Sequence, residues 1–191
     1  MGDWSFVIDP AWQPAEEGDE PPFEAVVGGW LLRDDGAVSL FRPNPSYQPS
    51  RPGLPTDPVD VVLQLLSAED DSEDDSEDDS EDSDSGSRGE DEQLGEELLT
   101  ALQEVLLGVA VDEHGMALVV PAPDGVPSVL VATAPAHRAR VDAESWREVT
   151  VVELVAALPP EGVDILLNPG APASTRLIAD AVRLSVTMPG S

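Results

Sequence analysis

The sequence has 191 residues and an extreme charge balance, with 39 acidic residues against nine basic ones and a net charge of −30. A surface this negative repels the phosphate backbone of nucleic acids and the anionic face of a membrane. The chain contains no cysteine, which excludes disulfides, thiolate nucleophiles and cysteine-based zinc sites, and all of its basic residues are arginine. Because the N-terminus also lacks a basic, apolar leader, we expect a soluble, cytoplasmic protein with no nucleic acid partner and no integral membrane segment.

Residues 1–22 are predicted to form an acidic, proline-rich N-terminal arm. Within it Trp4, Phe6 and Ile8 alternate along the chain, as they would on one face of a short strand. Two interpretations stay open: an arm that docks loosely on the rest of the protein, or an acidic-aromatic peptide that a partner grips.

Residues 23–66 are predicted to contain a hairpin, a proline-rich segment and a helix. Two β-prone runs flank Asp-Asp-Gly at 34–36, a strong hairpin signal. The stretch RPNPSYQPSRPGLP at 42–55 has too many prolines for a helix or a central strand, so we expect an extended connection. Asp57 then caps a helix whose first residue is Pro58, with apolar residues at helical spacing up to residue 66.

An acidic run follows this helix. Between Glu69 and Glu92 there are 15 acidic residues, many of them in tandem Asp-Ser-Glu-Asp units, and one arginine. Such a segment buries no apolar surface to offset its ordering entropy, so residues 67–93 are predicted to be a disordered linker or loop. A solvated spacer, a weak site for divalent cations and a target of an acid-directed kinase all remain open. An EF-hand is rejected because Gln93 stands where that loop requires glutamate.

Residues 94–187 are predicted to fold as a helix, three strands, a helix, a strand and a final helix. Turns at 114–115 and 124–125 separate the three strands, and 136–148 is expected to be irregular or briefly helical, with His137 at the surface. A capping box at 150–153 opens the second helix, which the double proline after residue 158 ends.

The stretch LLNPGAPAST near the C-terminus predicts a strand, a sharp turn and then a helix capped by Ser174 or Thr175. We assign Asn168, Pro169 and Gly170 a structural role in this turn. Free N–H groups at the helix start are the alternative, since they can bind an anion. The whole pattern is that of an α+β fold, a small mixed sheet with helices, interrupted by a long disordered acidic loop.

No catalytic template fits the sequence. Without lysine there is no phosphate-binding Walker loop and no Schiff base, and neither G-x-G-x-x-G after a strand nor G-x-S-x-G occurs. His114 is predicted to lie at a hairpin tip, where a polar residue before glycine is ordinary turn chemistry. We therefore predict a protein that is not an enzyme, with no catalytic residues, no cofactor and no metal.

Two resemblances follow from these motifs. Residues 94–185 resemble the SseB N-terminal domain family in the order of a strand ending near threonine or serine, a leucine-rich helix, a glycine, a strand and Asn-Pro-Gly. The front half resembles actinobacterial type VII secretion system-associated proteins, in which a Gly-Trp hairpin, R-P-N-P-x-Y-x-P-S and P-T-D-P-V-D precede an SseB-like domain; here they stand at 29–30, 42–50 and 55–60. The arginine-only basic set suits a GC-rich actinobacterial genome, whereas the long acidic run departs from the family pattern. The resemblance implies association with a secretion system rather than a reaction.

The leading hypothesis is a non-enzymatic accessory or adaptor protein associated with a type VII secretion system, acting through contacts with protein partners. The candidate partner-binding residues are Trp30, Arg42, Asn44 and Tyr47, since exposed proline and tyrosine favour peptide-like docking; a core role for Trp30 is the alternative. The competing hypothesis is an acidic electrostatic buffer or mimic that binds a basic protein through residues 69–92. A third, an enzyme that uses only carboxylates, requires two of them to converge in a pocket.

Overall fold

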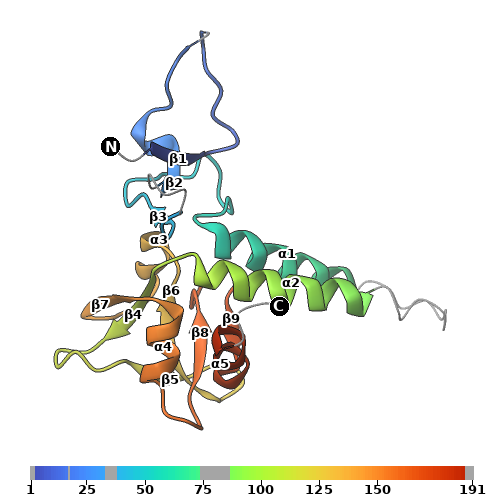
Figure 1. Cartoon of the computed structure of the whole chain (residues 1–191), viewed down its shortest axis with the longest axis vertical. Helices are drawn as coiled ribbons and strands as arrows, with labels where there is room; N and C mark the ends of the chain where they lie inside the picture. The colour runs from blue at the N-terminus through green and yellow to red at the C-terminus, as the bar shows by residue number, and fades with distance from the viewer. Residues whose placement is uncertain (1–2, 17, 33–37, 74–86, 188–191) are drawn as a thin grey trace.

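The computed structural model describes residues 3–16, 18–32, 38–73 and 87–187. These residues form two β-sheets, five α-helices and a short 3-10 helix, which confirms the α+β class. The smaller sheet lies at one end of the molecule, a pair of helices crosses the middle, and the larger sheet with the last two helices lies at the other end (Figure 1). In chain order the elements are β1 (Asp3–Ile8), η1 (Phe23–Ala25), β2 (Val26–Leu32), β3 (Arg42–Pro43), α1 (Pro58–Glu73), α2 (Ser87–Gln103), β4 (Leu107–Val111), β5 (Val119–Pro121), β6 (Pro127–Ala132), α3 (Pro135–Arg138), β7 (Ser145–Val149), α4 (Val151–Ala157), β8 (Asp164–Leu167), β9 (Thr175–Leu177) and α5 (Ala179–Thr187).

The smaller sheet joins the N-terminal arm to the predicted hairpin. β1 pairs antiparallel with β2, and β2 pairs antiparallel with β3. The return arm of the hairpin is in place, since Ser39 N donates to Leu31 O at 2.9 Å. Its tip, residues 33–37 with the predicted turn, lies outside the described residues. The alternating aromatic residues of the arm therefore belong to a strand, and within the described part of the chain that strand lies at the edge of the sheet.

The larger sheet has the strand order β7-β4-β6-β8-β9, with β5 also paired to β6. The three strands predicted between residues 107 and 133 are confirmed as β4, β5 and β6. β6 and β8 run parallel, and the other neighbours run antiparallel. The chain between β6 and β8 carries α3, β7 and α4, so the segment predicted to be irregular contributes a short helix and an edge strand.

The last two helices, α4 and α5, begin in different ways. α4 opens with the predicted capping box: Glu153 N donates to Thr150 Oγ1 at 3.2 Å, and Thr150 N donates to Glu153 Oε2 at 2.8 Å. The prediction that Ser174 or Thr175 caps the last helix is wrong. Residues 175–177 pair with β8 instead, and α5 begins at residue 179, whose N–H donates to Asp164 Oδ1 at 3.0 Å. The cap comes from a carboxylate 15 residues earlier in the chain, which local sequence does not reveal.

The acidic run lies between two helices that pack side by side, α1 and α2 (Figure 1). Both helices are longer than expected, because α1 continues through Glu73 and α2 begins at Ser87. A helix already nucleated on packed apolar residues can add further residues without a second costly nucleation step. Residues 74–86, the middle of the predicted 67–93 linker, lie outside the described residues.

The larger of the two hydrophobic clusters among the described residues connects the two halves of the chain. The front half contributes Phe41 and Leu63, and the back half contributes Leu102, Leu107 and Ile165, all at most 1% exposed. Phe41 also hydrogen-bonds through its N–H to the carbonyl of Glu104, just after α2. Residues 23–66 and 94–187 therefore share one core rather than forming separate ones.

Candidate functional site

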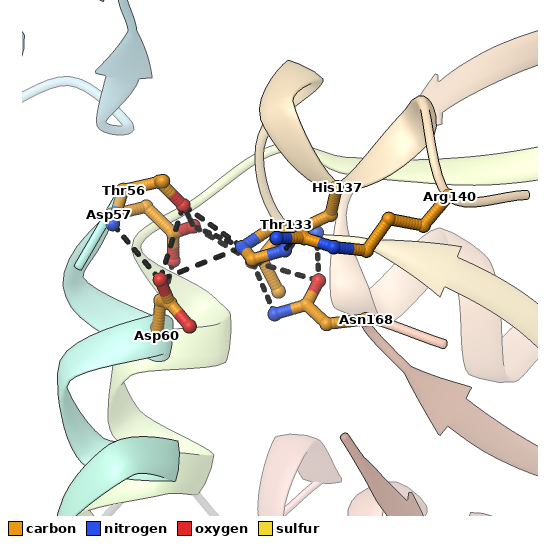
Figure 2. A network of polar contacts seen from close by, with 7 residues as sticks. All are labelled: Thr56, Asp57, Asp60, Thr133, His137, Arg140 and Asn168. Carbon is orange, nitrogen blue, oxygen red and sulfur yellow. Dashed lines mark hydrogen bonds and ion pairs between the residues drawn. The ribbon is translucent and has the colours of Figure 1, made fainter. Parts of the chain in front are cut away.

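A cluster of buried polar side chains lies where α1 meets the ends of two parallel strands (Figure 2). Thr133 directly follows β6 and Asn168 directly follows β8. Because the carboxyl ends of neighbouring parallel strands meet at one edge of a sheet, the two side chains lie side by side. The start of α1 and the short helix α3 supply the other members of the cluster (Figure 2).

Asn168 ties these strand ends together. It is fully buried in a left-handed conformation, with φ of 46°, which asparagine tolerates better than most residues. Its Oδ1 accepts from Thr133 N at 2.9 Å, and its Nδ2 donates to Thr133 Oγ1 at 3.0 Å. The sequence predicted that Asn168 is a turn residue. The structure shows that its side chain also hydrogen-bonds the end of β8 to the end of β6.

Asp57 is the predicted N-cap of α1 and the acceptor at the centre of the cluster. Its Oδ1 accepts from Asp60 N at 3.0 Å, which confirms the cap, and its Oδ2 accepts from Thr133 Oγ1 at 2.7 Å. Burial raises the pKa of the Asp57 carboxyl above its ordinary value, and the nearby charge of Asp60 adds to this, although the hydroxyl of Thr133 opposes it.

Asp60 lies on the same turn of helix but its pKa moves in the opposite direction. Burial by itself would raise the pKa of Asp60, but hydrogen bonds from His137 and from Thr56 hold it below the ordinary value. Thr56 N donates to Asp60 Oδ2 at 2.9 Å, and His137 Nε2 lies 3.6 Å from the same oxygen. Asp60 is therefore the member of the pair that carries negative charge most readily.

His137 is 3% exposed, so its predicted surface position is wrong. It lies in α3, where its two ring nitrogens bind on opposite sides: Nε2 is 2.9 Å from Thr56 Oγ1, and Nδ1 is 3.1 Å from Arg140 Nη1. A guanidinium group only donates, so Nδ1 must accept and the ring hydrogen lies on Nε2. That nitrogen cannot remove a proton from Thr56, and the Thr56–His137 pair does not have the arrangement of a nucleophile and its general base.

The cluster opens into a groove of about 800 Å3. Asp60, Gln64 and Ser67 of α1 line one side, and His137 and Arg140 line another. The remaining walls are mostly apolar and come from the loop before α1 and the loop after β8: Pro49, Arg51, Pro52, Gly53, Leu54, Ala171, Pro172 and Ala173. Asp57 does not line the groove, so the two carboxylates do not converge on it as a carboxylate-only enzyme would require.

The four predicted partner-binding residues are not gathered on one exposed surface. Trp30 is half-buried and meets the ring of Phe41 edge to face at 4.9 Å, which supports its alternative role in the core. Asn44 is structural: its Nδ2 donates to Phe23 O at 2.7 Å and to Val26 O at 2.9 Å. Arg42 is exposed.

Tyr47 is 9% exposed, so the expectation of an exposed tyrosine is wrong. Its hydroxyl donates to Asp9 Oδ2 at 3.1 Å, and Ser50 donates to the same carboxylate through both its N–H and its hydroxyl, at 2.9 Å each. Burial and the neighbouring Asp9 carboxylate raise the pKa of Tyr47 to about 12. The tyrosine therefore fastens the proline-rich segment to the N-terminal arm.

The outer face of the smaller sheet is exposed instead. Trp4 and Phe6 of β1 are 45% and 58% exposed, and their rings stack with centroids 5.8 Å apart and planes within 4° of parallel. Side chains alternate between the two faces of a strand, and the intervening Ser5 lies opposite Trp30 on the inner face. The spacing of the arm's aromatic residues indicated a strand with one aromatic face, but it could not show which face of that strand would be covered.

Two further observations concern metals and membranes. Within the described ranges, no three histidine, aspartate or glutamate side chains gather so as to hold a metal ion. None of the helices in the described part of the chain is long and apolar enough to cross a bilayer. Comparisons of the chain with protein-family models, with curated proteins and with solved structures found no match.

Proposed function

We propose that this protein is a non-enzymatic adaptor that binds another protein through the outer face of its N-terminal sheet. The observation that carries the proposal is the stacked pair of Trp4 and Phe6, two large aromatic side chains left open to solvent. Aromatic residues are enriched in protein interfaces because they bury a large area with few rotatable bonds. The Thr56–His137 geometry supports the non-enzymatic part of the proposal.

The position of the aromatic pair favours a partner that adds a strand. β1 is paired on one side only within the described residues, so its other backbone edge is available for a further strand. The chain carries a net charge of −30, with Asp3 beside Trp4. The partner we propose is a protein segment that adds a strand to β1, with apolar side chains over the aromatic pair and basic residues around them.

The partner class rests on the resemblance stated above. A chain similar to actinobacterial type VII secretion system-associated proteins is expected to meet components of that system, and we propose that it does so in the cytoplasm. The predicted segment RPNPSYQPS supports this role indirectly, since Asn44 binds it to the start of β2 and Tyr47 binds it to the N-terminal arm that carries the aromatic pair.

The experiment replaces the aromatic pair and measures binding to purified components of the secretion system from the same organism. The double variant Trp4→Ser/Phe6→Ser is expected to stay folded, because both side chains are exposed, and to lose at least about tenfold in affinity, as interface aromatics do. Met116→Ser is the matched control: it removes a 66% exposed apolar side chain at the β4–β5 turn and is expected to leave the affinity unchanged.

The same experiment separates the adaptor from the electrostatic buffer. In the buffer hypothesis, binding survives the Trp4/Phe6 change, weakens steeply with salt and disappears when residues 69–92 are deleted. That result, or failure of every secretion component to bind, would contradict the proposal. Concentration-dependent self-association that the double variant abolishes would identify a second copy of the chain as the occupant, which also contradicts it.

A further inference from the structure

The groove beside the polar cluster brings together two of the few positive charges of this chain. Only nine basic residues stand against 39 acidic ones. Arg51, in the loop before α1, and Arg140, just after α3, both line the groove although 89 positions separate them in sequence.

Four arginines have no carboxylate partner among the described residues: Arg42, Arg51, Arg140 and Arg147. Of these four, only Arg51 and Arg140 line the groove. Arg138, Arg176 and Arg183 each face a carboxylate. Neither Arg51 nor Arg140 forms an ion pair with any described residue, despite the excess of acid. An arginine that has no carboxylate partner among the described residues can bind an external anion, and its planar group suits an oxyanion.

Arg140 is held in place at the groove. The donation from its Nη1 to His137 Nδ1, at 3.1 Å, directs the guanidinium to a ring that is itself fixed by Thr56 (Figure 2). The predicted turn lies against the same arginine. Gly170 has φ of 76°, and a Cβ built there would lie 3.6 Å from Arg140 Cβ. The arginine is thus positioned before any ligand binds, which lowers the entropic cost of binding.

The rest of the groove defines the kind of molecule that fits. A volume of about 800 Å3 is far more than an inorganic ion needs and matches a small organic ligand. The apolar walls formed by Pro52, Leu54 and Ala173 suit an apolar body. Gln64 offers an amide at the same groove.

We propose that this groove binds a small organic oxyanion, whose carboxylate or phosphate pairs with Arg140 and Arg51 and whose apolar part lies against the proline-rich wall. This site is separate from the aromatic face of the N-terminal sheet and does not depend on the proposed adaptor role. The net charge of the chain repels anions in general, and the Asp60 carboxylate lines the same groove. Binding therefore requires that the two arginines outweigh both.

Calorimetric titration of the full chain at constant ionic strength tests the site with four probes: inorganic phosphate, phenyl phosphate, acetate and benzoate. Saturable binding of phenyl phosphate or benzoate is expected with a dissociation constant of about 1 mM or lower. The smaller anion of the same type should bind at least about fivefold more weakly, because it leaves the apolar wall uncovered. Comparison of the two aromatic probes tells a phosphate site from a carboxylate site.

Charge-matched variants decide whether the groove is responsible. Arg140→Gln and Arg51→Gln should each weaken binding at least about tenfold, the loss expected for one charged hydrogen-bonding pair. Arg42→Gln, which removes an exposed arginine outside the groove, should leave it unchanged. Arg51 makes no side-chain bond with the described residues, so its variant remains decisive if Arg140→Gln fails to fold. No binding of any probe, equal loss in Arg42→Gln, or unchanged binding in Arg51→Gln would overturn the proposal.

Discussion

Asp57 and Asp60 share one turn of helix, yet their surroundings give them opposite protonation preferences. Asp57 is enclosed by protein and close to a second carboxylate, which raises its pKa. Asp60 receives hydrogen bonds from Thr56 and His137, which lower its pKa despite burial. The sequence identified Asp57 as a helix cap, but the protonation of either carboxyl depends on residues more than 70 positions away.

The two aspartates should therefore affect stability with opposite dependence on pH. A raised pKa means that Asp57 stabilises the folded state below its ordinary pKa and loses this contribution as pH rises through the raised value. Asp60, with a lowered pKa, stabilises the folded state above its ordinary pKa and loses this as pH falls through the lowered value.

We predict that Asp57→Asn gains stability relative to the wild type as pH rises. Asp60→Asn should cost about 1–3 kcal/mol near neutral pH, because it loses a charged hydrogen-bonding partner, and less in acid. Urea unfolding over a series of pH values measures both differences. Parallel pH profiles for the two variants would contradict the opposite pKa directions.

At the scale of elements, the smaller sheet requires a residue without a side chain at Gly28 in β2. A Cβ on Gly28 would lie 2.4 Å from Phe41 Cζ and 2.5 Å from Arg42 O. Phe41 is part of the shared core, so the glycine lets the sheet approach it. The hairpin pattern in the sequence predicted the strands of this sheet. It did not predict the close approach of Gly28 to Phe41, which comes from the opposite arm of the hairpin.

We predict that Gly28→Ala destabilises the protein by about 1–3 kcal/mol, because the added methyl group overpacks a closed contact. Gly95→Ala is the matched control in α2: nothing lies within 4 Å of its Cβ. It should stabilise the protein by about 0.5–1 kcal/mol through helix propensity. Thermal and urea unfolding of the two variants measure these opposite signs, and equal effects would show that Gly28 is not constrained by Phe41.

At the scale of the whole molecule, the acidic run joins two helices that already pack on the common core. α1 contributes Val59 and Leu63 to this core and α2 contributes Leu98 and Leu102, all of them at most 4% exposed. All four residues lie outside positions 74–86. The run therefore interrupts one fold in sequence without dividing it in space.

We predict that replacing residues 74–86 by an uncharged glycine-serine segment of equal length preserves the fold. The midpoint of thermal unfolding should stay the same or rise, because the change removes mutual repulsion among like charges. Circular dichroism and calorimetry provide the measurement. A large loss of stability would show that the acidic residues contribute contacts to the folded unit.

Local sequence patterns were sufficient to predict the α+β class, the position of the acidic run between two apolar helices, the cap at Asp57, the capping box at Thr150 and the turn at Asn168. Each depends on residues within a few positions of one another, where periodicity and local hydrogen bonding decide the outcome. Long-range packing was needed to establish the burial of His137 and Tyr47, the start of the last helix, the exposure of the Trp4–Phe6 pair and the placement of Arg51 and Arg140 on one groove. These outcomes depend on which distant residues come together, because a side chain is buried, capped or left unpaired by neighbours that its own segment does not contain.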